Sequence, residues 1–192
     1  VNGKAWPLSK GGKRRDIGEG YKEVFSPCAG AGVYAIAAVR DAGGFDEEFF
    51  CYYEDVDLGF RLRLQGDRCL FIPNAVVHHV GSAITGKASD FSIYHAHRNF
   101  FYCYMKNMPA PLFQLFLPYH LYINLMSTLY FVVKGRGAVI LKSKRDALRA
   151  LPGLLEKRKA IQRARRIGYR DLLSRLSMAP IARRLLGPGS PT

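Results

Sequence analysis

The chain has few cysteines, and no two of them are close together in the sequence. The four residues, Cys28, Cys51, Cys69 and Cys103, form no Cys-x-x-Cys pair. Their spacing argues against a zinc module and against a disulfide framework. Each lies beside apolar or aromatic residues, so we expect small buried hydrophobic side chains in a reducing compartment.

Acidic residues are scarce in the last third of the chain. Residues 134–192 contain 16 Lys or Arg and only 3 Asp or Glu, whereas residues 1–133 contain 13 and 12. The net charge of +14 therefore belongs almost entirely to the C-terminal segment. Leu and Ile recur there at helix-like intervals, which predicts basic amphipathic helices. Helices of this kind lie on anionic membrane surfaces, with nucleic acid as the rival partner.

Charge is absent from residues 112–133, a run of 22 residues that is long enough to span a bilayer. Its interior contains Gln114, Pro118, His120 and Asn124, which a lipid-facing span would bury at a cost. We therefore expect an interfacial or shallowly inserted helix rather than a true span. A helix buried in a soluble core is the remaining alternative, but it would leave the basic segment unexplained. This run makes a membrane the preferred partner over nucleic acid.

The sequence also lacks an initiator Met, an internal repeat and a visible signal peptide. It begins with Val1, and residues 1–25 are rich in Gly, Lys and Arg, so we expect a loop at the start of a fragment cut from a longer protein. The length of 192 residues can hold one domain with a sizeable core, and 48% hydrophobic residues exclude a disordered chain.

The order of apolar runs and turn residues predicts an α/β fold. The expected elements are a strand over 32–36, a short helical turn ending at Gly43-Gly44, a helix over 54–66, strands over 68–72 and 75–80, a mobile loop over 81–90, and an aromatic helix over 91–108.

An acidic cluster opens the helix expected over 54–66. Glu54, Asp55 and Asp57 follow an aromatic run and occupy the first turn. Carboxylates there face unpaired backbone N–H groups and the positive end of the helix dipole, so an ionised carboxylate can serve as a proton acceptor. Position alone favours simple capping of the helix over a catalytic base. Asp57 and Arg61 are spaced i, i+4, which predicts an ordinary supporting ion pair.

A larger pattern favours the catalytic interpretation. Residues 26–109 resemble the C-terminal half of the catalytic domain of a family 2 glycosyltransferase, closest to bacterial rhamnosyltransferase-like members. The resemblance rests on Gly30-Ala31-Gly32, Gly43-Gly44-Phe45-Asp46-Glu47, Glu54-Asp55-Val56-Asp57-Leu58, Arg61, Gly66, Pro73, His78-His79 and Arg98-Asn99.

The resemblance implies a fold and a mechanism. The fold is the acceptor-side half of a GT-A-type domain, followed by an apolar helix over 110–135 and a basic amphipathic helical tail over 136–192. Asp55 would be the catalytic base of an inverting sugar transfer, and Glu54 would orient the acceptor or support Asp55. Family members hold a divalent cation, Mn or Mg, at an Asp-x-Asp motif in an N-terminal half, and no equivalent segment precedes Ser26 here. Because Asp55-Val56-Asp57 opens a helix, it is not taken as that motif.

Other site residues follow from the same resemblance. His79 would complete the coordination of the cation, with His78 as its structural neighbour; an ordinary strand-end histidine is the alternative. Arg98 and Asn99 would contact the diphosphate or the acceptor, unless they only pack on the helix surface.

Two further pairs are weaker candidates for substrate binding. Ser82 and Lys87 lie in the expected loop and could close over the donor. Gly30 and Ala31 would let the backbone approach the substrate closely, or would only permit tight strand packing.

Together these features predict an enzyme that moves a sugar from a nucleotide-sugar donor such as dTDP-rhamnose to a saccharide or lipid-linked acceptor. Its expected location is the cytoplasmic face of a bacterial inner membrane, in cell-surface polysaccharide synthesis. The alternatives are a non-catalytic module that binds membrane or nucleic acid, and an inactive accessory half of a glycosyltransferase.

Overall fold

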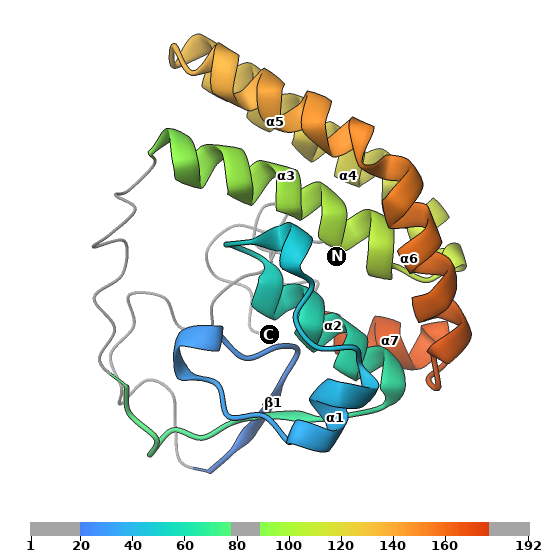
Figure 1. The fold of residues 1–192 in the computed structure, drawn as a ribbon. Coiled ribbons are helices and arrows are strands. Elements are labelled where there is room, and N and C mark those ends of the chain that lie inside the picture. Colours follow the sequence, from blue (N-terminus) through green and yellow to red (C-terminus); the bar gives the residue numbers. More distant parts are fainter. Residues whose placement is uncertain (1–19, 78–88, 177–192) are drawn as a thin grey trace, which may run out of the picture.

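A computed structural model describes residues 20–77 and 89–176, which form a mostly helical fold with one small sheet (Figure 1). The elements in chain order are β1 (Lys22–Val24), the 3-10 turn η2 (Ala29–Ala31), α1 (Ile36–Asp41), the 3-10 turn η3 (Glu47–Phe49), α2 (Glu54–Gln65), β2 (Cys69–Phe71), α3 (Asp90–Asn107), α4 (Ala110–Val133), α5 (Gly137–Arg149), α6 (Leu151–Ala164) and α7 (Tyr169–Arg175).

The helices agree with the sequence prediction because their ends carry local signals. Helix α2 stops at Gly66, whose φ of 96° lies in the left-handed region that favours glycine. Helix α3 starts after Ser89, whose side chain accepts a hydrogen bond from the backbone N–H of Ser92 over 3.2 Å. The predicted helical turn before Gly43-Gly44 is confirmed as α1, and the C-terminal amphipathic segment forms α5 and α6.

The strands differ from the prediction. The strand predicted over 68–72 is confirmed as β2, but it pairs antiparallel with β1, which lies in the segment expected to be a loop. The prediction of a strand over 32–36 is wrong: residues 32–35 have no regular secondary structure and pair with no strand among the described residues, and Ile36 already begins α1. Residues 75–77 form no strand either, and 78–80 lie outside the described residues. The GT-A-type half-domain stays a prediction.

Helix α3 lies at the centre of the described fold, with α2 on one side and α5 and α6 on the other (Figure 1). The C-terminal helices are fixed to it by polar contacts: Tyr94 donates to Asp146 over 2.9 Å, and Gln162 donates to the carbonyl of Asn107 over 2.9 Å. Apolar residues from both halves share one core, which includes Phe49, Phe60, Leu64, Phe101, Tyr104, Met108, Leu112, Ala147, Leu154 and Leu172. Part of the basic segment is therefore used to build the fold.

The cysteines meet the expectation only in part. All four are free thiols, as expected, but only Cys103 is buried. Cys28 is exposed because it immediately precedes η2 at the surface, and Cys51 and Cys69 are half-buried. The expectation of four buried side chains is therefore wrong for three of them.

Candidate active site

The turn before α2 has an unusual backbone. Phe50, Tyr52 and Tyr53 have φ values of 58°, 67° and 67°, in a region that bulky residues rarely adopt. Each such residue costs of order 1–3 kcal/mol unless the surrounding structure holds it in place. The direction in which α2 starts therefore depends on whatever holds this turn.

The residues that hold the turn are Arg98 and Asn99 on α3. The side-chain amide nitrogen of Asn99 donates to three backbone carbonyls, those of Phe49 at 2.8 Å, Cys51 at 2.8 Å and Tyr52 at 2.7 Å. The guanidinium of Arg98 donates to the carbonyl of Phe49 at 3.2 Å and to that of Glu48 at 2.8 Å. Asn99 is fully buried. The pair thus positions the turn, and its predicted contact with substrate stays a prediction.

Asp55 lies in the first turn of α2 and is half-buried. Its Oδ1 accepts a hydrogen bond from the backbone N–H of Val56 over 2.8 Å, so the carboxylate satisfies one of the unpaired N–H groups of the first turn. Its Oδ2 accepts from the backbone N–H of Ala29 over 3.0 Å. Because a carboxylate offers about four lone-pair positions, both bonds leave room for a further proton or hydroxyl partner.

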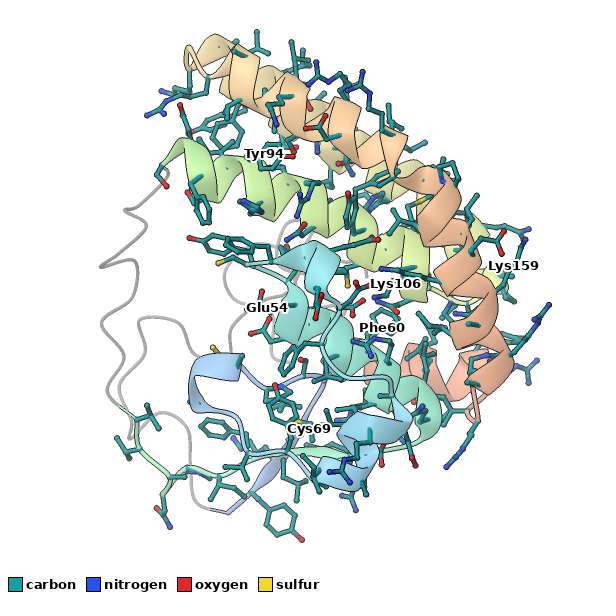
Figure 2. The ribbon with its side chains drawn as sticks, in the orientation of Figure 1. Glu54, Phe60, Cys69, Tyr94, Lys106 and Lys159 are labelled. Carbon is teal, nitrogen blue, oxygen red and sulfur yellow. The ribbon has the colours of Figure 1, made fainter. Side chains whose placement is uncertain are left out.

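Glu54 is the first residue of α2 and precedes Asp55. Figure 2 shows it at a distance from Lys106, whose label lies close to α6. Burial raises the pKa of Glu54, and the negative charge of Asp55 adds to the rise. Its Oε2 is buried and has no hydrogen-bond partner among the described residues. A buried carboxyl oxygen without a partner is costly, and a hydrogen bond from a polar group of a ligand would remove that cost.

Tyr34 belongs to the same site, although the sequence analysis did not select it. Its hydroxyl is buried without a hydrogen-bond partner in the described part of the chain. Burial and then the charge of Asp55 raise the pKa of Tyr34 to about 12, so the phenol stays protonated and can donate a hydrogen bond. The available signal was an aromatic residue within a run of small residues just after Gly30-Ala31-Gly32.

Two of the predicted substrate-binding residues lie next to Asp55. Gly30 and Ala31 are exposed in turn η2, whose first residue, Ala29, donates to the Asp55 carboxylate. A Cβ atom on the adjacent Gly32 would come within 3.0 Å of the Tyr34 ring. The turn thus packs closely against Tyr34 and presents small residues to solvent beside the carboxylate.

Asp57 has a different environment from Asp55. It is fully buried, and its carboxylate accepts hydrogen bonds from Arg61, Lys106 and Asn107, at 2.8 to 3.0 Å. The predicted pair of Asp57 and Arg61 is confirmed, but as part of a buried charge cluster. Lys106 also binds Asp46 over 2.6 Å. This cluster joins α2, α3 and the segment before η3, and it keeps Asp57 away from any substrate.

Residues 20–77 and 89–176 contain no group of three His, Cys, Asp or Glu side chains that could hold a metal ion. Asp55 and Asp57 are engaged separately, so the Asp55-Val56-Asp57 sequence is not a metal motif. His79, Ser82 and Lys87 lie outside the described residues. Their roles, and that of the cation, stay predictions.

Comparison with known proteins supports a sugar transferase. A segment of 61 residues is 43% identical to N-acetylglucosaminyl-diphospho-decaprenol L-rhamnosyltransferase from two strains of Mycobacterium tuberculosis. The match covers 31% of this chain and spans about a fifth of each relative, 20% of its length. No family model matches the chain, and no solved structure matches it. At the coarse level, the similarity is to a glycosyltransferase.

Proposed function

We propose that the chain carries the catalytic base and acceptor side of an inverting glycosyltransferase. The observation that carries this proposal is the Asp55 carboxylate, fixed at the start of α2 by the Ala29 N–H. Beside it lie polar atoms of Glu54 and Tyr34 that have no hydrogen-bond partner among the described residues. A base, a hydrogen-bond acceptor and a hydrogen-bond donor at one place match the needs of a sugar hydroxyl that is to be deprotonated.

The reaction is a direct displacement at the anomeric carbon of the donor sugar. Asp55 takes the proton from the acceptor hydroxyl as its oxygen forms a bond to that carbon. The bond from the carbon to the nucleotide diphosphate breaks on the opposite face, and the diphosphate leaves with the electron pair. Glu54 and Tyr34 orient the acceptor through hydrogen bonds. No step is assigned to a cation or to His79.

The similar mycobacterial enzymes suggest the substrates. Their name describes an L-rhamnosyltransferase that acts on N-acetylglucosaminyl-diphospho-decaprenol. We propose a rhamnosyl donor such as dTDP-rhamnose and a polyprenyl-diphosphate-linked saccharide as acceptor for this chain. With that acceptor, the proposed location is the cytoplasmic face of a bacterial inner membrane, and the proposed process is cell-surface polysaccharide synthesis.

Arg98 and Asn99 support the reaction indirectly in this proposal. Their hydrogen bonds hold the turn over residues 48–52, and this turn sets where α2 and its first carboxylates begin. Direct contacts of Arg98 with the diphosphate, and closure of Ser82 and Lys87 over the donor, are further parts of the proposal.

The test is a transfer assay with the full-length natural protein. The protein is incubated with dTDP-rhamnose and a short-chain polyprenyl-diphosphate-linked N-acetylglucosamine, and the product is analysed by mass spectrometry and by NMR of the anomeric centre. We expect one rhamnosyl group added, with inverted anomeric configuration. Absence of transfer from this and other nucleotide sugars would contradict the proposal, and retention of configuration would contradict its mechanism.

A further inference from the structure

Helix α4 exposes an unusually apolar face. Among residues 20–77 and 89–176 it is the one helix long and apolar enough to cross a membrane, and only 17% of its most apolar window is buried. Its exposed large side chains range from Met126, at 38%, to Val133, at 83%. They recur at helical spacing along one face: Leu115, Leu121, Tyr122, Leu125, Met126, Leu129, Tyr130, Val132 and Val133.

Two polar residues of α4, His120 and Asn124, lie on the opposite, inward face, whereas Gln114 near the start of the helix is exposed. His120 is fully buried and stacks on the ring of Tyr104 in α3, with ring centroids 4.0 Å apart. Asn124 is half-buried and accepts a hydrogen bond from the ammonium group of Lys144 in α5 over 2.6 Å. A helix on the surface of a protein in water shows the reverse arrangement, with polar residues outside. Over residues 121–133, the outer face of α4 is therefore built for an apolar environment.

Contacts near both ends of α4 indicate whether the helix spans a membrane or lies in its plane. Near its start, the hydroxyl of Tyr104 donates to the carbonyl of Phe113 over 2.6 Å, and near its end Phe131 packs on His97 at 5.1 Å. A helix of 24 residues is about 36 Å long, so one side of α4 is covered by protein over most of its length. Lipid can then contact only the outer side, which is the geometry of a helix lying in the membrane plane.

Cations follow α4 in the chain. Exposed Lys134 and Arg136 come directly after its end, with Arg136 paired to Asp90, and α5, which packs against α4, carries the exposed side chains of Lys142, Arg145 and Arg149 around Asp146. Tyr122 and Tyr130 are exposed in the apolar face itself, and tyrosine is enriched at the headgroup level of membranes. An anionic lipid surface complements this combination. A second copy of the chain would instead bring two strongly basic segments together.

We propose that α4 docks the protein on an anionic bilayer, with its outer face buried in the headgroup and upper acyl region and its axis in the membrane plane. Vesicle binding does not require sugar transfer, so the docking and the enzymatic proposal can fail independently of each other.

The test is flotation of the full-length protein with vesicles of phosphatidylcholine, with and without phosphatidylglycerol. The test variant is Leu125→Glu with Leu129→Glu, two exposed positions on the outer face. The matched control is Ile36→Glu with Val76→Glu, two exposed apolar positions far from α4 in the sequence. We expect the wild type and the control to float with anionic vesicles, and the α4 variant to bind roughly tenfold or more weakly.

A second pair of variants tests the cations without changing the apolar face. Lys134→Gln with Arg136→Gln should weaken binding to anionic vesicles and reduce its salt dependence, whereas Arg40→Gln with Arg68→Gln should do neither. Circular dichroism of every variant checks that it folds.

Three results would overturn the docking proposal: a wild type that does not bind vesicles, an α4 variant that binds like the wild type, or a control that loses binding equally. A wild-type dimer in solution that the α4 variant dissociates, without vesicle binding, would assign the face to a second copy. Resistance of the bound protein to alkaline extraction would indicate a span and overturn the in-plane geometry.

Discussion

The backbone N–H of Ala29 donates a hydrogen bond to Oδ2 of Asp55 over 3.0 Å, and this bond joins two segments that are 26 residues apart. It brings the small residues of turn η2 to the first turn of α2. Tyr34 follows the turn and packs against Gly32. The candidate site is thus assembled from a turn and a helix start rather than from one continuous motif.

Replacement of Tyr34 by Phe tests the assignment of its hydroxyl to the acceptor. The hydroxyl has no hydrogen-bond partner among the described residues, so its removal should change the free energy of unfolding by less than about 0.5 kcal/mol. The KM for the acceptor should rise, because a hydrogen bond to the bound sugar is lost. Urea unfolding and acceptor titrations measure the two effects. A large loss of stability, with no change in acceptor KM, would show that the hydroxyl serves the fold instead.

Asn99→Asp tests how the turn before α2 is held. The change keeps the shape of the side chain but places a carboxylate oxygen against three backbone carbonyl oxygens, so we expect a loss of at least about 2 kcal/mol in the free energy of unfolding. Urea unfolding gives this value. Gln114→Glu, the same chemical change at an exposed position, should have little effect. Equal stability of the two variants would be incompatible with the positioning role of Asn99.

Glu54 should make the stability of the protein fall as the pH rises. Burial raises the pKa of Glu54 in the folded state above its ordinary value of 4.5, so the folded state holds the proton to higher pH than the unfolded state does. Stability is therefore lost as the pH rises from 4.5 through the raised value. Glu54→Gln lacks this loss, and its stability relative to wild type should increase over that range in urea unfolding at several pH values. Glu47→Gln, at an exposed position, should track the wild type; the same behaviour from Glu54→Gln would rule out the raised pKa.

Asp46 should make the stability of the protein fall as the pH falls, the opposite of the effect of Glu54. Burial alone would raise the pKa of Asp46, but hydrogen bonds from Lys106 and Lys157 outweigh it and lower the pKa from 3.8 to about 2. The unfolded state therefore binds the proton first as the pH falls, and stability is lost between about pH 4 and pH 2. Asp46→Asn should cost about 2 kcal/mol above pH 4 and almost nothing near pH 2. Acid titration of stability, with the exposed Asp41→Asn as control, measures this. A cost that does not change with pH would contradict the ion-pair assignment.

Features encoded by local signals could be predicted from the sequence. Helix α2 has acidic residues in its first turn and Gly66 at its end, and the spacing of Asp57 and Arg61 predicted their ion pair. The strand predicted over 32–36 failed because a strand needs a hydrogen-bonding partner, and no segment in the described part of the chain pairs with it. The pairing of β1 with β2 joins residues 45 to 49 positions apart, which no local pattern reveals.

In the candidate site, too, local features could be predicted from the sequence and contacts between distant segments could not. Glu54 and Asp55 could be selected from the sequence because their position in a helix start is local. The roles of Tyr34 and Asn99 depend on contacts between distant segments, so the sequence did not indicate them. The sequence analysis expected the polar residues of α4 to make burial in lipid costly. His120 and Asn124 instead face protein, which only the packing of α3 and α5 reveals.

The most direct test of the central claim compares sugar transfer and donor binding in Asp55→Asn. If Asp55 is the base, the transfer rate should fall about 10²- to 10⁴-fold, while the affinity for the nucleotide-sugar donor stays near wild type. The variant should still fold, with a loss of about 1 kcal/mol because one of the two backbone N–H groups that bind the carboxylate loses its acceptor. Asp41→Asn, the same change at an exposed position, should transfer normally. Transfer by Asp55→Asn at a near-normal rate would contradict the assignment of the base to Asp55.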